Sequence, residues 1–303
     1  MSWIKRFGLF FLLNIIIVLT LSALTSLFGF DRFLSAKGLN YSQLALFCLV
    51  WGMGGAFISL ALSRIMAKWM MGVKLIDENS FDPRLQNLKH TVHELSRQAG
   101  LSVMPEVGVY EAAEINAFAT GPSRNRSLVA VSSGLLQQMT PQQVRGVLAH
   151  EVAHIANGDM VTMTLLQGVV NAFVMFLARV IALAVSQLFR NQDESTPASG
   201  GLAYFGIQMV LELIFMVFGS MLVASFSRWR EYRADAGGAR LGGRANMIAA
   251  LEGLKRNLQL PETDSPAAVA TLKIEGGKGQ GIMRFFASHP SLDDRIARLR
   301  AEA

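Results

Sequence analysis

The chain has 303 residues, of which 51% are hydrophobic and only 17% are charged, whereas a soluble globular domain carries about 25% charged residues. Its formal net charge is +6, but no basic run is interleaved with aromatic residues, so nucleic-acid binding is not expected. The one cysteine, Cys48, lies in an apolar stretch, which excludes both an intrachain disulfide and a cysteine-based zinc site.

Two long apolar runs open the chain, at residues 7–30 and 39–62. Each is long enough for a helix to cross about 30 Å of hydrocarbon. A cleaved signal peptide is the alternative for the first run, but this run is longer than a typical signal core and no A-x-A cleavage pattern follows it. We therefore expect residues 1–66 to form a transmembrane hairpin.

An amphipathic segment follows, and its apolar residues fit one face of a helix: Leu85, Leu88, Val92 and Leu95. His90 and His93 fall on the polar side of this helix. A role in metal binding is the less favoured interpretation for both of them.

The sequence next predicts a helix from Thr140 to about Gly158. Thr140 is a suitable N-cap, Pro141 suits the first helical position, and Gln143 completes a capping box. A glycine such as Gly158 commonly ends a helix.

This helix carries the sequence His150-Glu151-Val152-Ala153-His154. Residues four apart share one face of a helix, so both imidazoles can reach one zinc ion. Glu151 projects beside them, where it can act on a water molecule as general base. The alternative is two ordinary core histidines, but two histidines and a carboxylate aimed at an apolar core are costly without a partner.

Two further apolar runs, at residues 161–189 and 201–226, predict a second transmembrane hairpin. Arg179 lies 11 residues before Arg190, and Glu212 lies 11 residues after Gly201. In an antiparallel hairpin both are therefore about 16 Å from the same membrane surface. We expect a direct ion pair between Arg179 and Glu212; contacts with other polar groups of the spans are the alternative.

Flanking charges set the expected orientation. The basic excess lies before the first span and after the second and fourth, on the side of the two termini: Lys5, Arg6, Arg64, Lys68, Lys74, Arg228, Arg230 and Arg233. By the positive-inside rule this side is cytoplasmic.

The best candidate for a third zinc ligand is Glu231, directly after the fourth span. His154 lies just before the third span, so an antiparallel hairpin brings the two residues to one membrane face. Asp235 lies four residues after Glu231 and can orient a ligand imidazole by a hydrogen bond; we expect a similar supporting role for Asp159. The alternatives are that these acids only offset neighbouring arginines, or that another histidine is the ligand.

His289 precedes the last predicted helix. Ser291 is the expected N-cap of this helix, and Asp294 lies three residues after it. A lone histidine is usually structural. A hydrolase, however, needs hydrogen-bond donors for the oxyanion that develops, so His289 is a further catalytic candidate.

Taken together, these motifs resemble the HtpX-type membrane metalloproteases of bacteria, relatives of the CAAX prenyl proteases. The resemblance extends over essentially the whole chain. It depends on the two N-terminal spans, on the second hairpin of spans, and on three motifs: HEVAHIANGD at 150–159, SRWREYRAD at 227–235 and SHPSLDDRIARL at 288–299.

The resemblance implies that Glu231 is the third ligand of one Zn²⁺ per chain and that His289 lies near the active site. It also implies that the strand-like stretch around Asn116, Ala117 and Phe118 binds polypeptide substrates. The family acts on membrane or misfolded proteins in quality control and the heat-shock response, at the cytoplasmic face of the bacterial inner membrane. The sequence does not indicate an oligomeric state.

We thus expect an α+β, zincin-like (gluzincin) cytoplasmic metalloprotease domain on four transmembrane helices. Residues 67–160 and 227–303 would form this domain, interrupted by a transmembrane hairpin at 161–226. Two alternatives are weaker. An intramembrane-cleaving protease needs its metal ligands inside a span, whereas the candidate ligands here lie outside the predicted spans. A membrane scaffold with a structural zinc site usually needs four ligands, often cysteines, and this chain has one cysteine.

Overall fold

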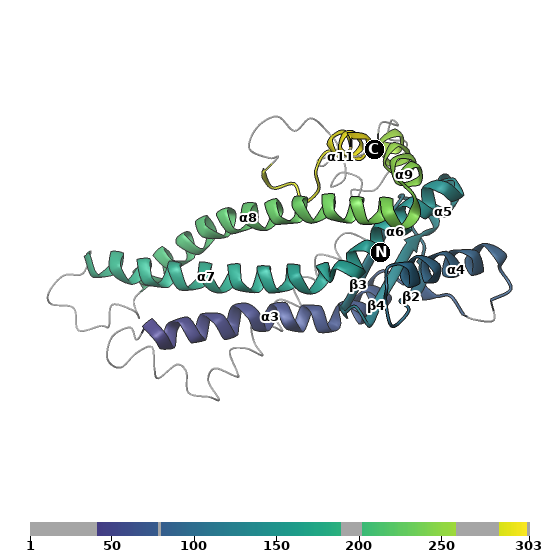
Figure 1. Cartoon of the computed structure of the whole chain (residues 1–303). Coiled ribbons are helices and arrows are strands. Elements are labelled where there is room, and N and C mark those ends of the chain that lie inside the picture. Colours follow the sequence, from purple (N-terminus) through teal and green to yellow (C-terminus); the bar gives the residue numbers. More distant parts are fainter. Residues whose placement is uncertain (1–40, 78–79, 189–201, 259–284, 302–303) are drawn as a thin grey trace. The chain divides into compact units, whose positions relative to one another are not determined.

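The computed structural model describes residues 41–77, 80–188, 202–258 and 285–301 (Figure 1). The predicted first span, residues 7–30, lies outside this part of the chain. The described elements in chain order are α3 (Tyr41–Met70), β1 (Lys74–Leu75), α4 (Pro83–Gln98), β2 (Glu106–Tyr110), β3 (Ala117–Ser123), β4 (Arg126–Ser132), α5 (Ser133–Gln138), α6 (Pro141–Asn157), α7 (Asp159–Leu188), α8 (Leu202–Gly242), α9 (Arg244–Leu258) and α11 (Leu292–Ala301).

The chain divides into two compact units, and the described parts of the first are residues 41–58, 165–188 and 202–219. This unit contains the apolar portions of α3, α7 and α8, the three described helices that are long and apolar enough to cross a membrane. The predicted spans at 39–62, 161–189 and 201–226 correspond to these helices. Their length and composition are those of a membrane protein.

Small residues allow the helices of the first unit to approach closely. A Cβ added at Gly52 of α3 would lie 2.5 Å from the backbone nitrogen of Ala172 on α7. A Cβ at Gly219 of α8 would lie 2.7 Å from a side-chain carbon of Val170, also on α7. Such contacts between small residues are typical of helix packing in lipid.

The second unit is built around a four-stranded sheet with the order β1-β2-β4-β3. β2 and β4 are parallel, and the other two pairs are antiparallel. β3 is therefore an edge strand. In the register of β3 with β4, Phe118 lies opposite Ala130 and Ala119 lies opposite Val129.

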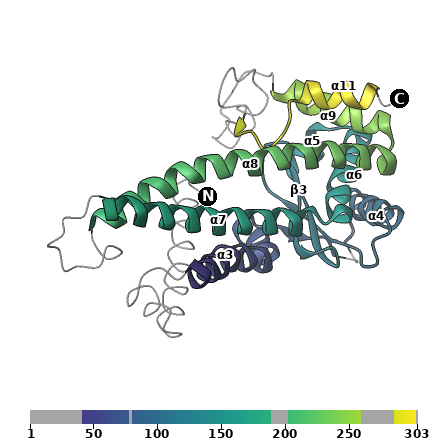
Figure 2. The ribbon, with the colours of Figure 1, turned by 60° about the vertical axis from the view of Figure 1, so that its left-hand side comes forward.

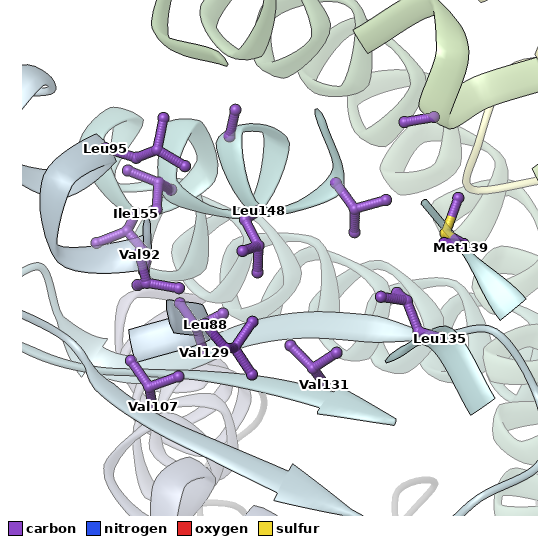
Figure 3. Close-up of a cluster of buried hydrophobic side chains, with 14 of the residues drawn as sticks. Leu88, Val92, Leu95, Val107, Val129, Val131, Leu135, Met139, Leu148 and Ile155 are labelled. Carbon is purple, nitrogen blue, oxygen red and sulfur yellow. The ribbon is translucent and has the colours of Figure 1, made fainter. Parts of the chain in front are cut away.

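The main core of the second unit lies between the sheet, α4 and α6 (Figure 3). Leu88, Val92 and Leu95 of α4 are buried here, as their helical spacing predicts. Val129 and Val131 of β4 meet them from the sheet. The core thus fixes α6 to the sheet through one face and leaves its other face for α8 and α9.

In the second unit, α8 continues as one helix to Gly242, beyond the end of its apolar run at residue 226. Figure 2 shows the last turns of α8 beside α6. Glycines make this approach possible, because a Cβ at Gly237 would lie 2.8 Å from the Cβ of Ala153, and a Cβ at Gly238 would lie 3.1 Å from the backbone nitrogen of His150. The close packing brings the carboxylates of α8 to the histidines of α6.

Candidate metal centre

The helix that carries the two histidines, α6, begins and ends as the sequence predicts. The side chain of Thr140 accepts a hydrogen bond from the Gln143 backbone N–H, and the Gln143 side chain accepts one from Thr140. At the other end Gly158 has a φ of 72°, a left-handed conformation that glycine adopts without strain. This local chemistry fixes the length of the helix and so the position of both histidines.

His150, His154 and Glu231 meet in the second unit. The Nε2 atoms of the two histidines are 3.0 Å apart, and they lie 3.4 Å and 3.3 Å from the two carboxylate oxygens of Glu231. One ligand atom from each residue lies within 4.8 Å of the others. All three residues are buried.

Each histidine has a carboxylate behind it. The Nδ1 atom of His150 lies 3.0 Å from Asp235, and the Nδ1 atom of His154 lies 2.6 Å from Asp159. In this arrangement Nδ1 carries the proton that the carboxylate accepts, which leaves the Nε2 lone pair for a metal ion.

Each carboxylate in turn meets an arginine, and these arginines were missed by the sequence analysis. Arg295 of α11 donates two hydrogen bonds to Asp235, at 2.7 and 2.6 Å. Arg233 donates one to Asp159 at 2.7 Å. The only signal in the sequence was their place within the motifs at 288–299 and 227–235, because nothing local links Arg295 to a residue 60 positions away.

The charges around the centre shift the pKa values of its groups. Burial by itself lowers the pKa of His150, but contacts with Asp235 and Glu231 outweigh it and raise the pKa to about 9. Burial by itself raises the pKa of Glu231, but contacts with His150, His154 and His289 outweigh it and hold the pKa below its usual range. Glu231 is therefore an anion at neutral pH.

These residues fit a metal ion. Two imidazole nitrogens that face each other at 3.0 Å repel when both present lone pairs, and a cation between them removes this repulsion. Glu231 Oε2 is buried and makes no hydrogen bond of good geometry with any described residue, although His289 Nδ1 lies 2.8 Å away. Two histidines and one carboxylate are a common set of three protein ligands for catalytic zinc.

Of the other candidate residues, Glu151 and His289 lie beside this group, whereas His93 lies outside it. Glu151 is half-buried on α6 next to His150. The side chain of His289 is 41% exposed, and its Nδ1 contacts Glu231. His93 is not part of the group; its Nε2 lies 3.1 Å from the carbonyl oxygen of Pro105.

The predicted substrate-binding residues lie at the start of the edge strand. Ala117 and Phe118 belong to β3, but Asn116 precedes it. The backbone N–H of Asn116 donates to the side chain of Ser132, and its carbonyl accepts from the Ser132 backbone. The Asn116 backbone is therefore occupied by the sheet, and only its exposed side chain is available to a ligand.

Comparison with known proteins identifies the family. A model of peptidase family M48 matches residues 83–303. The chain is 49% identical to "Protease HtpX homolog" of Bacillus licheniformis and 48% identical to that of Bacillus subtilis, in each case over 98% of this chain and 99% of the relative. It is 46% identical to "Protease HtpX" of Chromohalobacter salexigens, with 98% of each chain covered.

A solved structure shares the fold. The crystal structure of S. mikatae Ste24p is similar with a TM-score of 0.66 at 17% sequence identity, over 98% of this chain. The chain spans 65% of the length of that structure. From the family match, the HtpX relatives and the apolar helices we conclude that the chain belongs to peptidase family M48, as a membrane metalloprotease of the HtpX type.

Proposed function

We propose that this protein is a zinc-dependent endopeptidase that cleaves membrane or misfolded proteins at the cytoplasmic face of the bacterial inner membrane. The observation that carries the proposal is the buried group of His150, His154 and Glu231, in which each histidine has a carboxylate on its Nδ1 atom. Residues 67–160 and 227–303 would form the protease domain.

His150, His154 and Glu231 would hold one zinc ion. Bound there, zinc would polarise the scissile carbonyl and lower the pKa of a water molecule toward about 7. Asp235 and Asp159 would keep the two imidazoles in the tautomer and orientation that ligation requires.

Glu151 would move the proton. It takes a proton from the attacking water as general base and returns it to the leaving amine as general acid. His289, whose ring contacts Glu231 and is partly exposed, would donate a hydrogen bond to the developing oxyanion.

The edge of β3 that faces away from β4 would bind the substrate as an added strand. Asn116 and Ser132 form a hydrogen-bonded pair, and in an antiparallel ladder such pairs alternate with pairs that do not bond each other. The backbone N–H and C=O groups of Ala117 and Ala119 therefore point away from β4. These outward N–H and C=O groups could pair with an extended polypeptide. Phe118 between them packs against the side of the sheet that also buries Tyr110.

The proposed orientation depends on flanking charge. Arg64 and Lys68, after the second predicted span, both form ion pairs with Glu106 of the second unit, at 2.8 and 2.7 Å. Basic residues near a membrane helix favour the cytoplasmic side, which would put the metal centre there as well.

The experiment that tests this function is metal analysis of the purified protein together with casein digestion, with and without a chelator. We expect about one zinc per chain, digestion of casein, and loss of digestion on chelation that added zinc restores. A structural zinc site in a membrane scaffold would give zinc without digestion. Digestion that survives complete removal of metal would contradict the proposal.

A further inference from the structure

The short segment that leads into α11 lies against the part of α8 that follows its apolar run. Arg228, two residues beyond the end of this run, donates hydrogen bonds to the carbonyl oxygens of Ala287, at 2.7 Å, and Phe285, at 3.3 Å. Figures 1 and 2 both show this segment, in yellow, beside α8. The segment is therefore held at the level where α8 changes from apolar to basic.

Three large aromatic side chains are exposed on α8 just after its apolar run and on the segment bound to Arg228. Trp229 is 53% exposed, Phe285 40% and Phe286 36%. Leu222, about two turns before Trp229 on the same face of α8, is also exposed, so the exposed apolar surface of the helix extends to Trp229. We name Trp229, Phe285 and Phe286 the aromatic patch.

We propose that the aromatic patch is a membrane-contact surface, which seats the segment 285–289 in the interfacial region of an anionic lipid bilayer. Tryptophan and phenylalanine side chains are suited to this region, because it accepts apolar rings while neighbouring polar groups stay hydrated.

Charge favours a lipid surface as the partner. Arg228 precedes Trp229 in sequence and donates to backbone carbonyl oxygens, contacts that leave its charge uncompensated, whereas Arg230 and Arg233 pair with Glu231 and Asp159. Arginines beside exposed aromatic rings match anionic headgroups above an acyl boundary. A polypeptide substrate also offers apolar side chains, but continuity with the apolar surface of α8 favours lipid over substrate.

The contact has a consequence for the metal centre. His289, three residues after Phe286, has its Nδ1 atom 2.8 Å from Glu231 Oε2. Seating the segment in the bilayer therefore holds the His289 ring against the ligand carboxylate. This second step depends on the proposed function, whereas the membrane contact itself does not.

The membrane contact can be measured on the full chain in bilayer nanodiscs that contain anionic lipid. The buried Cys48 is replaced by alanine, and a polarity-sensitive fluorophore is attached to Phe286→Cys. The matched control carries the label at Ala301→Cys, an exposed position at the far end of α11. Nitroxide lipids, with the quencher either near the headgroups or at the acyl chain ends, report contact and depth.

We expect the label at position 286 to be quenched by the headgroup-proximal nitroxide, at a depth of about 5–10 Å into the boundary. The label at position 301 should be much less quenched. Equal quenching at the two positions would overturn the proposal. Quenching at position 286 only on addition of nitroxide-labelled casein would also overturn it, since the patch would then be a substrate surface.

The link to the metal centre is tested with Phe286→Ser. We expect a several-fold lower rate of casein digestion in bilayers with unchanged metal content, and recovery of the rate with Phe286→Leu. Phe81→Ser, at a phenylalanine that is 100% exposed elsewhere in the second unit, is the control and should change neither quantity. A full rate in Phe286→Ser would overturn the link, and so would loss of metal in this variant, because the lower rate would then come from a structural defect at the metal centre.

Discussion

Arg179 of α7 and Glu212 of α8 form a direct ion pair between two membrane helices, with 2.8 Å between Nη1 and Oε1. This confirms the pairing that equal depth in the two predicted spans indicates. Gln208 also donates to Glu212 at 3.1 Å, and the Arg179 guanidinium lies 5.8 Å from the ring centre of Phe47 on α3. The pair thus joins the three described helices of the first unit.

Removal of one partner should destabilise the membrane helices strongly. We expect Arg179→Leu or Glu212→Leu alone to cost about 3–5 kcal/mol, because each leaves an unpaired charge in an apolar environment. The double variant should recover most of this loss. Thermal unfolding in nanodiscs measures the effect.

The control for this prediction is the surface pair of Arg145 and Glu94, 2.8 Å apart, whose removal should cost only about 0–1 kcal/mol. A double variant no more stable than the worse single variant would count against the role of the Arg179–Glu212 pair.

The packing of α8 on α6 should control metal affinity. In Gly237→Ala, the new Cβ lies 2.8 Å from the Cβ of Ala153, so the helices must separate. Such overpacking costs about 1–3 kcal/mol, and it should also draw Glu231 away from the histidines and lower metal affinity in a chelator competition. Gly206→Ala on the same helix has open space and should preserve affinity. Equal affinities in the two variants would contradict the prediction.

The proposed ligand Glu231 and its neighbour Asp235 should differ in their effect on metal. Glu231→Ala would remove a proposed ligand atom, so we expect loss of most bound zinc together with loss of activity. Asp235→Asn would leave the proposed ligand set complete and should weaken metal binding by about 10–100-fold. If the Glu231 variant holds zinc as tightly as the unaltered protein, another residue is the ligand, and His289 is the first to examine.

The outward backbone groups of β3 should matter for substrate. Ala119→Pro removes an N–H that points away from β4, so β3 should stay paired while kcat/KM for a peptide falls by up to about tenfold, the worth of one hydrogen bond. Thr120→Pro would remove an N–H that points toward β4 and should destabilise the sheet. Unchanged kcat/KM in folded Ala119→Pro would exclude this edge as the substrate site.

Much of this site could be predicted because its signals are local. The capping box of Thr140 and Gln143 and the left-handed Gly158 fix α6, and a spacing of four residues puts His150 and His154 on one face. Equal depth in two antiparallel spans was enough to pair Arg179 with Glu212. These inferences need only helix geometry and sequence separation.

The remaining features depend on contacts between residues far apart in the sequence. Arg295 meets Asp235 only because α11 packs beside α8 and α9, and the parallel pairing of β2 with β4 requires that β3 be placed outside β4. The close approach at Gly237 and Gly238 is likewise a property of two helices together. Composition and periodicity describe one element at a time and do not contain these pairings.

The central claim is that Glu151 is the general base beside a zinc ion held by His150, His154 and Glu231. The most direct test is Glu151→Gln, measured for zinc content and for cleavage of a fluorogenic peptide in the same preparation. Gln is close to Glu in shape but cannot take the proton. We predict full zinc content and a rate lower by about 10²–10⁴-fold or more. Full activity in the zinc-loaded variant would contradict the mechanism.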